Sequence, residues 1–169
     1  MELVNRNYIK VTDRDLFAIL LSAMESSNTK RCLYFDRLIR TKLDLALSLR
    51  KHIDEVYIDI NEPSFKELGF DMMEIPISGE SFSKARDKAL EKGGDLEIVR
   101  KMLPFQFADS IMPSELDEEV LDYILDNSEN VIKYGYFYDG SDLKYRNPDE
   151  EQKGIEDKRK SFTNKPIQG

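Results

Sequence analysis

Residues that could perform covalent chemistry are scarce in this 169-residue chain, which holds one histidine, His52, and one cysteine, Cys32. Nucleophilic catalysis commonly needs a base beside the nucleophile. Twenty positions separate the two residues on what we predict to be a single helix, which places them about 30 Å apart. We therefore predict that they do not form a catalytic pair. Cys32 is expected to be a small core residue, and His52 a cation near the end of a helix.

Metal chemistry is open mainly to carboxylates, because structural zinc usually takes four cysteine or histidine ligands and the chain has only two such residues. The pairs that could contribute to a Mg²⁺ or Mn²⁺ site are Asp13 with Asp15, Asp59 with Glu62, and Asp139 with Asp142. Close pairs also arise by chance among 33 acidic residues, and the first pair suits the first turn of a helix. We predict no metal site and no cofactor. A carboxylate-only, metal-dependent hydrolase stays an alternative.

Other classes of protein are disfavoured by motifs that the sequence lacks. Neither GxxxxGK[ST] nor GxGxxG occurs, so no glycine-rich loop is predicted to hold the phosphates of a nucleotide. The apolar runs are far shorter than the roughly 18 to 20 residues of a membrane-spanning helix. A single cysteine allows no internal disulfide framework, which agrees with a reducing compartment. We expect a cytoplasmic protein that does not contact a membrane.

Charge is distributed unevenly along the chain. Residues 28–52 carry seven basic and two acidic residues, a net charge of +5, whereas residues 53–151 carry 10 basic and 25 acidic residues, a net charge of −15. Positive charge near aromatic residues is suited to phosphate contact, and the candidates for nucleic-acid contact are Lys30, Arg31, Arg37, Arg40 and Lys51. The alternative is a solvated helix face with ordinary ion pairs between Arg40 and its neighbours Asp36 and Asp44.

The elements that must position these residues are mainly helical. A capping box formed by Thr12 and Asp15 starts a helix over residues 13–26. A second helix runs from a cap at Thr29 to about Ile53 and is apolar on more than one side, which predicts a central position. Shorter helices are predicted after Pro63, between Ser81 or Ser83 and Lys92, over residues 95–103, and after Pro113.

The best strand covers residues 131–138, which are rich in β-branched and aromatic side chains and end at the turn dipeptide Asp139-Gly140. We expect it to pair with residues 3–11 or 56–60. The sequence thus predicts a mainly helical α+β protein with a helical core and a small β element. Residues 1–146 are expected to form one globular domain, and residues 147–169 a flexible charged tail.

This scarcity of catalytic groups favours a non-catalytic protein-binding module that acts as an inhibitor, an adaptor or a subunit of a larger complex. The candidate contact residues are Arg37, Arg40, Glu118, Asp122, Tyr136 and Tyr138. Tyr134, Tyr136 and Tyr138 alternate along the predicted strand and project from one face, which is either an interface or core. An alternative is an accessory factor of replication or transcription whose basic helix, residues 29–52, contacts nucleic acid. The sequence specifies no oligomeric state.

Overall fold

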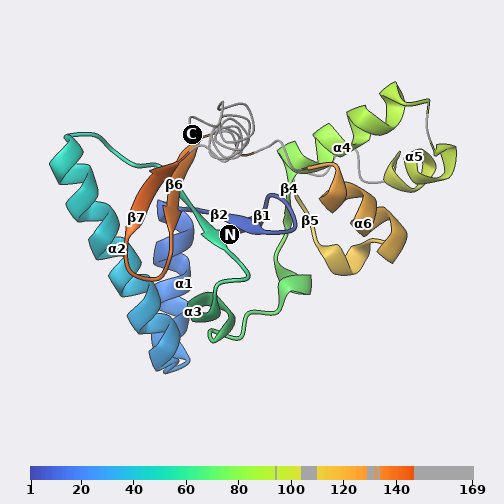
Figure 1. Ribbon diagram of the computed structural model, residues 1–169. Coiled ribbons are helices and arrows are strands. Elements are labelled where there is room, and N and C mark those ends of the chain that lie inside the picture. Colours follow the sequence, from blue (N-terminus) through green and yellow to red (C-terminus); the bar gives the residue numbers. More distant parts are fainter. Residues whose placement is uncertain (94, 104–109, 129–131, 133, 147–169) are drawn as a thin grey trace, which may run out of the picture.

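The computed structural model describes residues 1–93, 95–103, 110–128, 132 and 134–146. Within these ranges a seven-stranded mixed sheet carries two groups of helices (Figure 1). The strands are β1 (Glu2–Leu3), β2 (Tyr8–Thr12), β3 (Glu55–Asp59), β4 (Ile77–Ser78), β5 (Ser110–Ile111), β6 (Gly135–Tyr138) and β7 (Leu143–Arg146). The helices are α1 (Asp13–Glu25), α2 (Thr29–Leu49), α3 (Pro63–Lys66), α4 (Gly79–Glu91), α5 (Leu96–Met102) and α6 (Glu118–Asp126). Single 3₁₀ turns occupy Met72–Glu74 and Pro113–Glu115.

The strands follow the order β5-β4-β1-β2-β3-β6-β7 across the sheet. The pairs β1–β4 and β3–β6 are parallel, and the other four neighbouring pairs are antiparallel. Strand β6 lies beside β3, with Tyr57 opposite Phe137 and Ile58 opposite Tyr138. The expected pairing of the aromatic strand with residues 56–60 is therefore confirmed.

Alternation along the central strands divides the apolar side chains between the two faces of the sheet. Ile9, Val11, Val56, Ile58 and Tyr138 join the main core with buried residues of α1, α2 and α3. A smaller cluster consists of Val4, Tyr57, Ile132 and Phe137, with Tyr8 packed against it. Tyr8, Tyr57 and Phe137 are the neighbours, along their strands, of the main-core residues Ile9, Ile58 and Tyr138. At the β4 end of the sheet, α4 packs against α5 and α6 (Figure 1).

The prediction of a helical core with a small β element is wrong about the sheet, which is large and runs through the core. Three of its strands, β1, β4 and β5, have only two residues each. Such strands are too short to display the alternation by which a strand is recognised in a sequence. Residues 131 and 133 of the predicted aromatic strand, and the predicted tail of residues 147–169, lie outside the described residues.

Helix α2 covers one side of the sheet and is not the central helix that its sequence predicts. Phe35 and Leu38 are fully buried, but Leu33, Leu43 and Leu47 are exposed. The helix is also shorter than predicted. It ends at Leu49 because Arg50 adopts the left-handed conformation, with φ of 52°.

Candidate functional site

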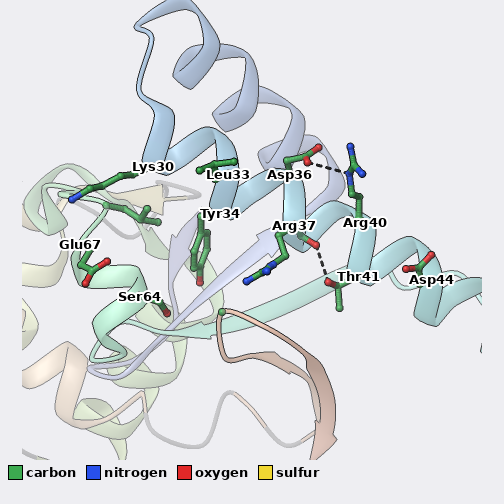
Figure 2. Close-up of a pocket in the computed structure, with 12 residues that line it drawn as sticks. Lys30, Leu33, Tyr34, Asp36, Arg37, Arg40, Thr41, Asp44, Ser64 and Glu67 are labelled. Atoms are coloured by element: carbon green, nitrogen blue, oxygen red, sulfur yellow. Dashed lines mark hydrogen bonds and ion pairs between the residues drawn. The ribbon is translucent and has the colours of Figure 1, made fainter.

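A groove of about 600 Å³ lies between α2, α3 and the turn that joins β6 to β7 (Figure 2). Its side chains come from three separate parts of the sequence. Eight belong to α2, one to α3, two directly follow α3 in sequence, and one belongs to the turn. The lining residues are Lys30, Leu33, Tyr34, Asp36, Arg37, Arg40, Thr41, Asp44, Ser64, Glu67, Leu68 and Gly140.

The helical repeat of α2 explains why its polar residues line the groove. Burial of Phe35 and Leu38 fixes the rotation of the helix about its axis. Residues spaced by three and four positions then lie on one side, which brings Leu33, Arg37 and Arg40 to the groove in successive turns. Asn28 starts this arrangement as the helix cap, accepting a hydrogen bond from the backbone N–H of Arg31 at 3.2 Å.

The groove carries charges of both signs, and several of them have no ion-pair partner in the described part of the chain. Arg40 is paired, since its Nε lies 3.0 Å from Asp36 Oδ2. Lys30 and Arg37 offer positive charge, and Asp44 and Glu67 offer negative charge, without an ion pair among the residues that the structure describes. The groove therefore has about equal positive and negative charge along its walls.

Beneath the groove lies a set of buried hydroxyl groups. The side-chain oxygens of Tyr34, Ser64 and Tyr138 are all buried, and none has a hydrogen-bond partner within the described residues. Tyr34 extends from α2 toward Ser64 of α3, with Arg37 beside it (Figure 2). The rings of Tyr34 and Tyr138 meet edge to face, with centroids 5.3 Å apart. Gly140 in the turn is close enough that an added Cβ would lie 2.7 Å from Ser64 Oγ.

Burial raises the pKa of both tyrosines, because it disfavours the charged phenolate. For Tyr34 the nearby carboxylates of Glu62 and Asp139 add to this effect on the pKa. Burial raises the pKa of Tyr138 to about 12, although the positive charge of Arg37 opposes the increase. Both hydroxyls are therefore protonated at neutral pH and able to donate a hydrogen bond.

The basic residues predicted to contact nucleic acid do not form one surface. Lys30, Arg37 and Arg40 line the groove. Arg31 instead holds the loop after α3: its Nε donates to the carbonyl oxygen of Leu68 at 2.9 Å, and its guanidinium lies 3.9 Å from the centre of the Phe70 ring. Lys51 is exposed beyond the end of α2 and is not part of the groove.

The predicted acidic contact residues lie on α6, among the helices at the β4 end of the sheet (Figure 1). Asp122 already has an ion-pair partner at the surface, because Arg6 Nη2 lies 3.1 Å from its Oδ1. Arg6 Nε also lies 2.5 Å from Asp126 Oδ1. The hydrogen bonds that Arg6 donates to the carboxylates of Asp126 and Asp122 raise the pKa of Arg6. Glu118 is exposed and has no ion pair in the described ranges. Helix α6, which carries these acidic residues, thus contributes no residue to the groove.

The two predicted tyrosine contacts differ in exposure. Tyr138 is 2% exposed and belongs to the main core. Tyr136 is half-buried, and its ring meets that of Tyr145 edge to face with centroids 5.2 Å apart. The described surface therefore presents Tyr136, and Tyr138 supports the groove from below through its contact with Tyr34.

The residues considered for catalysis or metal binding have other partners. His52 Nε2 lies 3.2 Å from both Asp13 Oδ2 and Asp54 Oδ1, and Cys32 is at the opposite end of α2. Asp15 completes the capping box of α1 with Thr12. Asp139 accepts hydrogen bonds from the backbone N–H groups after it. In the parts of the chain that the structure describes, no three His, Cys, Asp or Glu side chains are grouped to hold a metal ion.

No family model, curated protein or solved structure matches the chain. Across the described ranges, no helix combines the length and the apolar character that crossing a bilayer requires. Sequence reasoning identified the basic residues Lys30, Arg37 and Arg40 of the groove but missed Ser64, Glu67 and Gly140. The sequence holds no signal that would have joined them, since α3 and the β6–β7 turn are brought to α2 only by the fold.

Proposed function

We propose that this chain is a non-catalytic protein-binding module, an inhibitor, adaptor or subunit of a larger complex, and that the groove receives a segment of its partner. The observation that carries the proposal is the set of groove charges without partners, Lys30 and Arg37 together with Asp44 and Glu67. Leu33, which is 68% exposed, adds an apolar contact beside them. Such a surface is suited to a polypeptide, which carries apolar side chains and charges of both signs.

The chemistry of the lining supports binding over catalysis. Ser64 is the one serine among the lining residues, and its hydroxyl has no hydrogen-bond partner in the described residues. A serine nucleophile needs a base within hydrogen-bond reach, and the lining contains no histidine. The unpartnered hydroxyls beneath the groove instead offer hydrogen bonds to a bound segment after a small shift of side chains.

Charge balance favours a protein partner over nucleic acid. The positive charges of Lys30, Arg37 and Arg40 are matched in number by three acidic residues of the same lining. A nucleic-acid groove depends on a clear excess of positive charge, because each phosphate contact is electrostatic. Binding of a short DNA or RNA is therefore not expected.

The proposal is tested by panning a library of random 12-residue peptides against the full-length chain and measuring the affinity of the enriched peptides. Arg37→Glu and Glu67→Lys each reverse one unpaired groove charge and are expected to weaken binding at least tenfold. The matched controls, Arg100→Glu and Glu97→Lys, change exposed residues of α5 and should leave the affinity unchanged.

Three outcomes contradict the proposal. No peptide is enriched, or the groove variants bind as well as the controls, or the unmodified chain binds a mixed-sequence oligonucleotide with an affinity that falls steeply with salt. The last outcome favours the accessory factor of replication or transcription over the protein-binding module.

A further inference from the structure

A second surface, separate from the groove, exposes apolar side chains in a regular row. Phe17, Leu21 and Met24 follow one another along α1 and are 60%, 59% and 61% exposed. Leu43 and Leu47 lie on the adjacent side of α2 and are 58% and 76% exposed. Phe17 and Leu43 also line one hollow of about 160 Å³ between the two helices, so the rows are continuous. We call these five residues the α1–α2 apolar face.

The size of this face is unusual for a surface that stays in water. Five large side chains at these exposures present on the order of 600 Å² of apolar area, at the upper limit of what soluble monomers expose in one patch. Two such faces packed together would remove roughly 1,200 Å² from water before any rim contacts are counted. That area reaches the lower limit of a standard protein interface.

The charges at the two ends of α1 indicate what covers the face. Arg14 is in the first turn and Glu25 is the last residue of the helix, 11 residues away, or about 16 Å along the axis. Both lie on the same side of the helix as Phe17, Leu21 and Met24 by its 3.6-residue repeat. Neither has an ion pair among the described residues.

Each of these charges also opposes the dipole of its own helix. A basic residue near the helix N-terminus and an acidic residue at the C-terminus each lose about 0.3 to 1 kcal/mol relative to the reverse arrangement. Charges that are unfavourable for their own helix, at both ends of one exposed row, are typical of a surface whose residues are also selected for function.

We propose that the α1–α2 apolar face binds a second copy of this chain, with the two α1 helices antiparallel across a twofold axis near Leu21. Antiparallel packing brings Arg14 to Glu25 of the partner subunit, and Glu25 to Arg14 of the partner subunit, at the two ends of the contact. A twofold interface must be complementary to itself, and a row with opposite charges at its ends meets that condition. The apolar residues between them form the centre of the interface.

Sedimentation velocity of the full-length chain from 1 to 100 µM tests the proposal. We expect a dimer above roughly 10 µM, as suits an interface of this size. Leu21→Glu should weaken the dimer at least tenfold. Leu90→Glu, at a leucine of α4 that is 57% exposed, is the matched control and should leave the dimer unchanged.

Charge reversal tests the antiparallel arrangement itself. Arg14→Glu and Glu25→Arg each place like charges together and should weaken the dimer about tenfold, whereas the double variant should restore it. Both substitutions agree with the helix dipole, so α1 is expected to stay folded in all three variants. A monomer at every concentration overturns the proposal. So does a dimer that the single reversals do not weaken, or that the double reversal does not restore. Because the groove is a different surface, none of these results bears on the proposed function.

Discussion

Replacing Tyr34 by Phe should stabilise the protein. The Tyr34 hydroxyl is buried without a hydrogen-bond partner in the described residues. Its ring meets three other aromatic rings, those of Phe35, Phe65 and Tyr138, with centroids 5.1, 6.4 and 5.3 Å away. Phenylalanine keeps the ring in these contacts and removes only the oxygen. The substitution therefore isolates the free energy of one unpartnered hydroxyl.

The magnitude follows from what an unmade hydrogen bond costs. A buried polar group without a partner destabilises the folded state by about 1 to 3 kcal/mol relative to its hydrated form. Tyr34 is 8% exposed, so almost no solvation is recovered. We expect Tyr34→Phe to raise the free energy of unfolding by about 1 kcal/mol, which corresponds to an increase in Tm of about 2 to 4 °C for a chain of this size.

Alkaline pH should widen the difference between the two proteins. Burial raises the pKa of Tyr34 in the folded state, so the unfolded chain loses the phenolic proton first, near pH 10. The stability associated with the protonated hydroxyl is fully present below that pH and is lost as the pH rises above it. Tyr34→Phe lacks this loss, and its advantage should therefore grow above pH 10.

Urea unfolding at pH 7 and at pH 10.5 measures both effects, since a change of about 1 kcal/mol moves the midpoint by about 0.5 M at an unchanged slope. Tyr57→Phe is the matched control, because the Tyr57 hydroxyl donates to Glu55 Oε1 at 3.2 Å. That variant should lose about 0.5 to 1.5 kcal/mol. A loss of 1 kcal/mol or more in Tyr34→Phe at pH 7 would refute the reasoning and show that its hydroxyl is hydrogen-bonded, for example to an ordered water.

Further substitutions test the turn and the basic strip around the groove. Gly140→Ala places a Cβ 2.7 Å from Ser64 Oγ at a residue whose φ is +96°, and it should lower the free energy of unfolding by about 2 kcal/mol. Gly69→Ala is the control, because φ is +69° there but the space is open, and it should cost about 1 kcal/mol. Equal losses in urea unfolding would contradict this difference. The backbone N–H groups of Asp142 and Ser141 each donate a hydrogen bond to Asp139 Oδ1 at 2.8 Å, and these bonds hold the pKa of Asp139 below its ordinary value. The stability that Asp139 contributes should thus be present above about pH 4 and lost as the pH falls below it. In urea unfolding, the free energy of unfolding of Asp139→Asn should fall less steeply between pH 5 and 2 than that of the unmodified chain. An equally steep fall would count against the hydrogen bonds of the turn. Arg31→Ala should lower the free energy of unfolding by about 2 kcal/mol, because it loses the hydrogen bond to Leu68 and the contact with the Phe70 ring. Lys30→Ala, the control, should change it by less than about 0.5 kcal/mol. Thermal unfolding measures both variants, and equal effects would contradict the structural role of Arg31.

Features set by neighbouring residues could be predicted from the sequence. The capping box of α1 is confirmed in both directions: Asp15 N donates to Thr12 Oγ1 at 3.3 Å, and Thr12 N donates to Asp15 Oδ2 at 3.0 Å. Helix α3 begins at Pro63, as predicted. Each of these signals lies within four residues, so no knowledge of tertiary contacts was needed.

Features set by distant residues could not be predicted in this way. Arg31 has the same charge as Lys30, yet its partner is the carbonyl oxygen of Leu68, 37 positions away. Likewise, the groove exists only because α3 and the β6–β7 turn meet α2. A charge pattern along the sequence shows which residues are basic, but only the fold decides which of them are already engaged.

The wrong prediction for α2 is informative for the same reason. Apolar residues around most of a helix predict that the helix is buried, but the pattern does not say by what. The sheet needs only one side of α2, and it buries Phe35 and Leu38 completely while Leu43 and Leu47 stay exposed. Among the described residues, the number of apolar side chains on α2 therefore exceeds what the fold covers. An excess of this kind, continued on α1 by Phe17 and Leu21, is what a helix pair that packs against another protein surface requires.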